Sequence, residues 1–173
     1  LTYYVLESSP GLLDEQRERL TEESGKGKVV WLSPAAMEKG QFAMEGCIIS
    51  NELLDAFPVH RVFCDNGRLR EIYVGEEEGE FREVRGELSD CRLDAYFSDL
   101  GILLADGQAA EVNLQSLDWL EGVGRCLSRG FLLTIDYGLR AHELYDPTRR
   151  NGSLRCFYRH QVGDNPYERV GRQ

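Results

Sequence analysis

Three short apolar runs in this sequence end in polar side chains of the kinds that bind ligands or move protons. Glu7 follows one run, the pair Asn51-Glu52 follows another, and Asp136 follows a third. Open α/β sheets bind ligands outside the carboxyl ends of their strands, where the strand order reverses. A carboxylate such as Glu7 at that edge can accept hydrogen bonds from a ribose diol. The pattern predicts a cofactor site, although acids in such places also cap the helices that follow them.

Other kinds of catalytic site lack their sequence signatures. The chain has no GxxxxGK[ST] phosphate loop and no GxSxG elbow for acyl transfer. Its three histidines (His60, His142 and His160) lack HExxH spacing, and neighbouring cysteines lie 17 or more residues apart. We therefore expect no metal site and no CxxC redox pair. Five scattered cysteines are typical of a reducing compartment, which favours a cytoplasmic location.

The elements that must position these side chains follow a β-α-β order, which is typical of a parallel sheet. Four apolar runs predict parallel strands with their carboxyl ends at one edge: residues 3–7, 28–32, 46–50 and 131–136. Apolar spacing and end signals predict four helical segments: residues 10–23, 51–56, 89–101 and 111–129. Ser9 and Pro10 are typical of a helix start, and Gly130 is expected to end the last helix.

Residues 59–86 are expected to form an antiparallel insertion in a single α/β domain that spans residues 1–173. Within it, Asn66-Gly67 is a strong hairpin signal between two strand-like runs. Residues 81–84 are expected to add a third strand, and a further strand is predicted at 153–159. We expect the hairpin to stand outside the parallel core, as a lid over the acceptor.

The charge of the chain limits its partners. A net charge of -10 and a pI near 4.8 disfavour nucleic acid, because a field of that sign repels phosphate backbones. Residues 139–173 differ, with seven arginines against four acids. Arg149, Arg150, Arg155 and Arg159 either pair with acids elsewhere in the fold or bind an anionic ligand, since arginine suits both roles. No run approaches the roughly 18 apolar residues of a membrane span.

Four segments carry a specific family resemblance. The run CIISNELLDAFPVHRV at 47–62 resembles the strand and turn that mark the MidA methyltransferases, a group that includes the mitochondrial complex I assembly-factor methyltransferases. The runs LLTIDYG at 132–138 and ELYDPTRRNGSLRCFYRHQVGDNP at 143–166 are similar to the same family, in the same order. The run YYVLESSPGLLDEQRERL at 3–20 is similar to its second strand and following helix. The resemblance covers nearly the whole chain.

This resemblance implies a class I methyltransferase fold, which is a Rossmann-like parallel sheet, and methyl transfer from S-adenosylmethionine. The implied cofactor-binding residues are Glu7, Ser8, Trp31 and Asn51, with Glu7 on the ribose. Trp31 is either a platform for the adenine or an ordinary core aromatic residue, and the sequence leaves both interpretations open.

The resemblance also implies a set of catalytic residues: Asn51, Glu52, Asp55 and Asp136. Asn51 and Glu52 would lie beside the sulfonium and the incoming nucleophile. If the acceptor is a guanidinium, Glu52 can bind it bidentately, and Asp55 or Asp136 can take the proton lost after transfer. A protein arginine is the acceptor associated with the mitochondrial members, which links the activity to respiratory complex assembly and, in a eukaryote, to the mitochondrial matrix.

The sequence departs from the family pattern before Leu1, where the first strand and its glycine-rich loop are expected. We therefore expect an N-terminally truncated catalytic domain that shows no turnover alone. In the usual class I strand order, the missing strand lies between the second and the fourth. The alternative function is a non-catalytic assembly or binding factor that retains the fold. A nicotinamide oxidoreductase is a third possibility, because an acid after the second strand also suits NAD.

Overall fold

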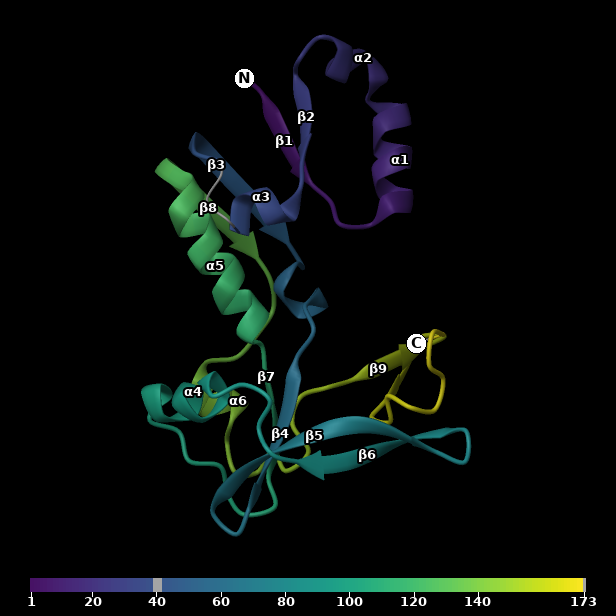
Figure 1. The fold of residues 1–173 in the computed structure, drawn as a ribbon, viewed down its shortest axis with the longest axis vertical. Coiled ribbons are helices and arrows are strands. Elements are labelled where there is room, and N and C mark those ends of the chain that lie inside the picture. The colour runs from purple at the N-terminus through teal and green to yellow at the C-terminus, as the bar shows by residue number, and fades with distance from the viewer. Residues whose placement is uncertain (39–41, 173) are drawn as a thin grey trace. The chain divides into compact units, whose positions relative to one another are not determined.

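A computed structural model describes residues 1–38 and 42–172 of the chain. The chain forms two compact units, each assembled from two separate stretches of sequence (Figure 1). Unit 1 comprises Leu1–Asn51 and Ser116–Ile135, and unit 2 comprises Glu52–Gln115 and Asp136–Gln173. No helix within the described ranges combines the length and the apolar character needed to cross a membrane.

Unit 1 contains the four predicted parallel strands as two separate pairs. Strand β1 (Tyr3–Leu6) is parallel to β2 (Val29–Leu32), and β3 (Met44–Asn51) is parallel to β8 (Leu127–Ile135). The parallel direction within each pair is as predicted. No hydrogen-bonded ladder joins the two pairs among the residues that the structure describes. A common edge for all four strands therefore stays a prediction.

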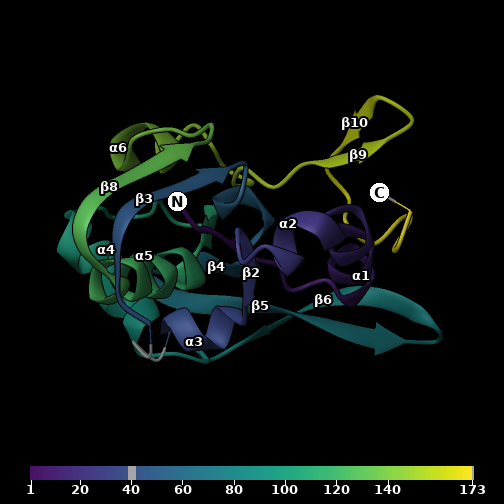
Figure 2. The same cartoon turned by 90° about the horizontal axis from the view of Figure 1, so that it is seen from above.

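Helices cover these strands and form the core of unit 1. The predicted helix at 10–23 is two helices, α1 (Pro10–Arg19) and α2 (Thr21–Gly25), and a short helix α3 (Pro34–Glu38) was not predicted. Helix α5 (Leu114–Cys126), most of which belongs to unit 1, lies beside the β3–β8 pair (Figure 2). The core consists of side chains from α3, α5 and the two strands: Met37, Val123 and Cys126, packed against Ile48, Trp119 and Leu132.

The predicted helix at 111–129 is wrong at both of its ends. Residues up to Val112 form a strand, β7 (Ala109–Val112), because Ala110 and Val112 are buried in a sheet with β4 (His60–Asp65). The helix then ends at Cys126, and β8 begins at Leu127. Gly130 is consequently a strand residue and does not stop the helix. Long-range pairing overrides local helix propensity at both places.

Unit 2 is built on an antiparallel sheet with the strand order β6-β5-β4-β7. Its strands are β4 (His60–Asp65), β5 (Arg68–Glu77), β6 (Glu80–Gly86) and β7. The predicted hairpin is confirmed: β4 and β5 are antiparallel, and both turn residues, Asn66 and Gly67, have positive φ as a tight hairpin turn requires. The third antiparallel strand, β6, is confirmed as well. The pairing of β7 with β4 was not predicted.

The remaining elements of unit 2 pack on this sheet or follow it. They are the 3-10 turn η1 (Leu54–Ala56), helices α4 (Arg92–Leu100) and α6 (Ala141–Leu144), and strands β9 (Cys156–Tyr158) and β10 (Gln161–Gly163). The predicted helical turn at 51–56 and strand at 153–159 are thus shorter than expected, and β10 was not predicted. The core contains seven buried residues: Val62, Leu93, Phe97, Ala110, Val112, Leu114 and Tyr145.

Candidate functional site

The carboxylate of Glu7 is held in place within unit 1 by two donors. Its Oε1 accepts a hydrogen bond from the Ser9 backbone N–H at 2.8 Å, and its Oε2 accepts one from Gln16 Nε2 at 3.3 Å. Glu7 therefore does order the start of α1, as acids after strands commonly do. A carboxylate has about four lone-pair positions, so both oxygens can still accept hydrogen bonds from a ligand.

Trp31 belongs to the same hydrogen-bond network. Its Nε1 donates to Gln16 Oε1 at 3.1 Å, and the Arg17 guanidinium lies 5.9 Å from the centroid of its ring. Ser8 is exposed, and its side chain makes no hydrogen bond to any residue that the structure describes. The structure thus brings Glu7 and Trp31 together through Gln16, which the sequence analysis did not single out.

Two of the expected catalytic segments emerge from adjacent strand ends. Asn51 is the last residue of β3, where it is exposed and pairs in register with Ile135 at the end of β8. Glu52 and Asp136 are the residues that follow directly. Because β3 and β8 pair in parallel, as the sequence predicted, Glu52 and Asp136 each follow directly after one of two paired strand ends.

In unit 2, Asp136 orders the short turn that carries Asp55. Its Oδ2 accepts a hydrogen bond from the Leu54 backbone N–H at 3.0 Å, and its Oδ1 accepts one from the Tyr137 N–H at 2.9 Å. Asn113 Nδ2 donates to the Leu54 carbonyl at 2.8 Å. Side chains from two distant segments thus hold η1. Asn113 is a site residue that the sequence analysis missed, because it is distant in sequence from the turn it holds.

Asp55 accepts a hydrogen bond from the hydroxyl group of Tyr137. This hydrogen bond, desolvation, and the negative charges of Asp55, Glu52 and Asp136 raise the pKa of Tyr137 to about 12. The phenol therefore stays protonated at neutral pH and acts as a donor. Tyr137 is a second missed residue, although it lies inside the LLTIDYG segment that carries the family resemblance.

Glu52 differs from the other acids of this cluster. Its backbone has a φ of 45°, in the left-handed region that costs a residue other than glycine about 1–3 kcal/mol. Its side chain is exposed and makes no hydrogen bond or ion pair with any residue in 1–38 or 42–172. A strained backbone that presents an uncommitted carboxylate is typical of a functional position.

The acidic cluster, defined as Glu52, Asp55, Asp136 and Tyr137, can interact with a cationic group. An uncommitted carboxylate can bind a guanidinium bidentately, and a second carboxylate can accept a proton. Among the described residues, no group of three histidine, cysteine or acidic side chains is placed to hold a metal ion.

A second polar cluster in unit 2 contains Ser89, His60 and Glu71, the residue types of a catalytic triad. Glu71 Oε1 and Ser89 Oγ both approach the same nitrogen, His60 Nδ1, at 2.8 and 3.4 Å. In a triad, the acid and the serine contact opposite nitrogens of the ring. Glu71 Oε2 also accepts from the Ser89 N–H at 2.6 Å and from the Tyr73 hydroxyl at 3.1 Å. The cluster therefore stabilises a buried carboxylate in the sheet.

Glu71→Gln is expected to lower the free energy of unfolding near neutral pH by about 1–3 kcal/mol, the range for hydrogen bonds to a charged group. Burial alone raises the pKa of Glu71, but the hydrogen bonds from His60, Ser89 and Tyr73 outweigh it, and the pKa lies below its ordinary value of 4.5. A depressed pKa contributes stability above the ordinary value, and that contribution is lost as the pH falls through the folded-state pKa.

This prediction is checked by urea unfolding at a series of acidic pH values. The free energy of unfolding is measured for the wild type, Glu71→Gln and Glu78→Gln. Glu78 is exposed at the β5–β6 tip and serves as the matched control. The difference between wild type and Glu71→Gln should shrink toward low pH, and the control should show no such difference. A pH-independent difference would contradict the assignment.

Comparison with known proteins identifies the family. All of residues 1–173 match a family model described as "Putative S-adenosyl-L-methionine-dependent methyltransferase". No curated protein shows significant similarity to the chain.

Two crystal structures of one superfamily from Burkholderia thailandensis are similar to the chain, each at 28% identity over 96% of its length. One is a "likely methyl transferase" bound to S-adenosyl-homocysteine (TM-score 0.76), and the other is an uncharacterised protein in its native state (TM-score 0.78). The chain spans 42% and 44% of those proteins. Because the family match extends over the whole sequence and these folds agree with it, the chain belongs to this family of S-adenosyl-L-methionine-dependent methyltransferases.

Proposed function

We propose that the complete protein transfers a methyl group from S-adenosylmethionine to an arginine side chain of a protein, as a member of the MidA group. The observation that carries this proposal is the acidic cluster of unit 2, in which Glu52 presents an uncommitted carboxylate next to a protonated phenol and two further acids. Arginine is the cationic side chain that such a carboxylate binds bidentately. The proposal includes the link to respiratory complex assembly and the cytoplasmic or mitochondrial-matrix location.

The Glu7 network fits the ribose of the cofactor. Each carboxylate oxygen of Glu7 has one donor in the structure and retains a further lone pair, which suits a ribose diol. Gln16 orients both Glu7 and Trp31, so we propose that the tryptophan positions the carboxylate as well as contacting the adenine. Ser8 and Asn51 complete the proposed cofactor side. The bound cofactor supplies a methyl group on a sulfonium, which is a good leaving group.

The acidic cluster supplies the acceptor side. Glu52 is proposed to bind the acceptor guanidinium and orient its nitrogen, so that the protein contributes mainly by positioning the reacting atoms. Both oxygens of Asp136 already accept backbone hydrogen bonds, which supports a positioning role for this residue. Asp55 remains as the proposed acceptor of the proton lost after transfer, with Tyr137 as the donor that keeps it in place.

The proposed domain is a methyltransferase catalytic domain of which this chain forms part, with residues 59–86 as its antiparallel insertion and acceptor lid. One face of the β3–β8 pair carries exposed apolar side chains: Ile49, Phe131, Leu133 and Ile135. Alternate residues of a strand point to opposite faces, and the other face packs on α5 through Ile48 and Leu132. We propose that other segments of the complete protein pack on this exposed face and that a further strand joins the two parallel pairs at their edges.

Glu7→Gln is expected to weaken S-adenosylmethionine binding by about tenfold while changing the rate constant of the bound complex little. The reason is that a ribose contact acts equally in the ground state and the transition state, and loss of one hydrogen bond to a charged group corresponds to about a factor of ten. Isothermal titration calorimetry on the complete protein measures this.

Glu15→Gln is the matched control for Glu7→Gln, because Glu15 lies on α1 and pairs with the exposed Arg19. Unchanged cofactor affinity in Glu7→Gln would remove the ribose assignment. The function itself is tested by transfer of a labelled methyl group from the cofactor to protein, followed by mass spectrometry of the product. Cofactor binding without any methyl transfer would support the non-catalytic assembly factor instead.

A further inference from the structure

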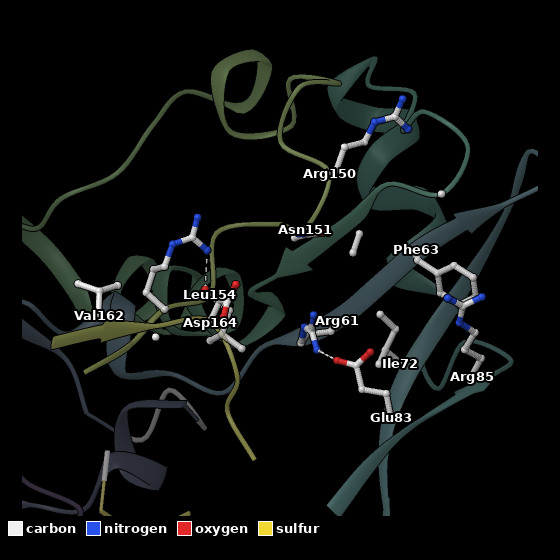
Figure 3. A pocket seen from close by; sticks show the side chains of 14 residues that line it. Arg61, Phe63, Ile72, Glu83, Arg85, Arg150, Asn151, Leu154, Val162 and Asp164 are labelled. Atoms are coloured by element: carbon white, nitrogen blue, oxygen red, sulfur yellow. Dashed lines mark hydrogen bonds and ion pairs between the residues drawn. The ribbon is translucent and has the colours of Figure 1, made fainter. Parts of the chain in front are cut away.

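A second site candidate in unit 2 is a pocket of about 620 Å³ between the antiparallel sheet and the C-terminal segment (Figure 3). It is lined by side chains of β4, β5 and β6 on one side and by residues 150–155 and 162–164 on the other. This volume lies within the range of pockets that bind small molecules or peptide side chains. None of its lining residues belongs to the acidic cluster.

The pocket has the opposite charge to the chain as a whole. Four arginines and two acids line it, in a protein whose net charge is -10. Arg61 is committed to neighbouring acids: it pairs with Glu83, and its Nε lies 3.5 Å from Glu111 Oε1. Desolvation alone lowers the pKa of Arg61, but the hydrogen bond to Glu83 and the negative charges of Glu83 and Glu111 together outweigh it, and the pKa is raised above its ordinary value. Arg61 therefore lines the pocket as a charged side chain that is already paired with acids.

Two other arginines of the pocket have no acidic partner among the described residues. The Arg85 guanidinium lies over the Phe63 ring at 4.3 Å from its centroid (Figure 3), and it forms no ion pair with any residue in the described part of the chain. Among the residues that the structure describes, Arg155 donates only to the Leu154 carbonyl, at 2.7 Å. A guanidinium has five N–H donors, so both side chains retain most of their capacity for a carboxylate. Contact with an aromatic ring also preorganises Arg85.

This arrangement bears on the two interpretations of the C-terminal arginines. Arg149, Arg150, Arg155 and Arg159 were expected either to pair with acids or to bind an anion, and none of the four forms an ion pair among residues 1–38 and 42–172. Arg150 instead donates to the Asp106 carbonyl, and Arg159 lies over the Tyr158 ring. Within the described part of the chain, the structure therefore shows no ion pair in support of pairing with acids, although Arg149 interacts electrostatically with Asp146.

The lining favours a peptide over a densely charged phosphate ligand. Glu83 is already paired with Arg61, but Asp164 also lies among the arginines and disfavours densely clustered negative charge more than single carboxylates spaced along a peptide. Ile72 and Val162 offer apolar surface for aliphatic side chains, whereas Phe63 is buried beneath Arg85. A segment with carboxylates spaced by apolar residues matches both features.

We propose that this pocket docks an acidic segment of the protein substrate, with Arg85 and Arg155 binding its carboxylates. The assignment of the segment to a substrate rests on the proposed function. The binding itself is independent of methyl transfer and is measured separately.

The test is fluorescence anisotropy of the complete protein with a fluorescein-labelled peptide in which Asp and Glu alternate with Leu and Val. We expect saturable binding that weakens with added salt and that is lost for a matched peptide carrying Asn and Gln. Arg85→Gln and Arg155→Gln are each expected to weaken binding about tenfold, the effect of one charge-assisted hydrogen bond. Arg68→Gln removes the same charge from an exposed position outside the pocket and should leave the affinity unchanged.

Three outcomes would overturn the proposal. In the first, the protein binds the acidic and the amide peptide with equal affinity. In the second, Arg68→Gln weakens peptide binding as much as Arg85→Gln does. In the third, inorganic phosphate competes with the labelled peptide as strongly as unlabelled peptide does. Calorimetric binding of S-adenosylmethionine to the same preparations separates the two claims. Cofactor binding without peptide binding would refute only the docking site, and peptide binding without cofactor binding would refute only the proposed methyltransferase function.

Discussion

Glu52→Gln in the complete protein is expected to lower turnover by about 10²–10⁴-fold, the usual contribution of a positioned acid–base group, while leaving cofactor affinity nearly unchanged. Glutamine keeps the shape of the side chain but removes the negative charge that would bind the acceptor guanidinium. The wild-type carboxylate has no partner among the described residues, so its loss removes no internal hydrogen bond. The measurement is single-turnover methyl transfer, with cofactor affinity determined by calorimetry.

Two further variants make this result interpretable. Glu45→Gln is the matched control, because Glu45 is an exposed acid near the other end of β3, and its turnover should equal that of the wild type. Glu52→Gly tests the strained backbone, since glycine adopts a φ of 45° without cost. Glu52→Gly should be at least as stable as the wild type, and its turnover should be as low as that of Glu52→Gln. Wild-type turnover in Glu52→Gln would exclude the catalytic role of this residue.

Gly130→Ala is expected to destabilise unit 1 by about 2–6 kcal/mol, the sum of about 1–3 kcal/mol for overpacking and about 1–3 kcal/mol for left-handed backbone strain. Gly130 has a φ of 143°, and a Cβ atom there would lie 1.8 Å from the Gly46 carbonyl oxygen on β3. Because that atom is backbone in the paired strand, it cannot move aside without breaking the β3–β8 register. Denaturant unfolding followed by circular dichroism measures the change.

Gly124→Ala provides the control for Gly130→Ala in the same unit. Gly124 lies in α5, has nothing within 4 Å of a built Cβ atom, and is exposed. Alanine is favoured over glycine in a helix by about 0.8–1.0 kcal/mol, so this variant should be slightly more stable than the wild type. Equal stabilities of the two variants would show that β3 and β8 do not approach as closely as the structure places them.

The strands and the hairpin could be predicted from the sequence because their signals are local. The apolar runs that became β1, β2, β3 and β8 and the turn at Asn66-Gly67 each depend on residues within a few positions. The acidic residues Glu7, Glu52 and Asp136 were found for the same reason, since each follows an apolar run directly. The family resemblance was found in four distinctive segments of the sequence. The family match over residues 1–173 agrees with it at the level of an S-adenosylmethionine-dependent methyltransferase.

The other features of the fold and of the candidate site could not be predicted, because they depend on contacts between residues far apart in the chain. Ala109–Val112 is a strand because β4 offers it hydrogen bonds, and Gly130 is tolerated in β8 because β3 approaches there without side chains. The hydrogen bond between Asp55 and Tyr137 joins residues 82 positions apart. The charge pattern of the C-terminal arginines was visible in the sequence, but only the folded chain placed Arg85 of β6 and Arg155 of the C-terminal segment in one pocket. Local propensity determines which elements can form, whereas burial and long-range pairing determine which of them form and which side chains meet.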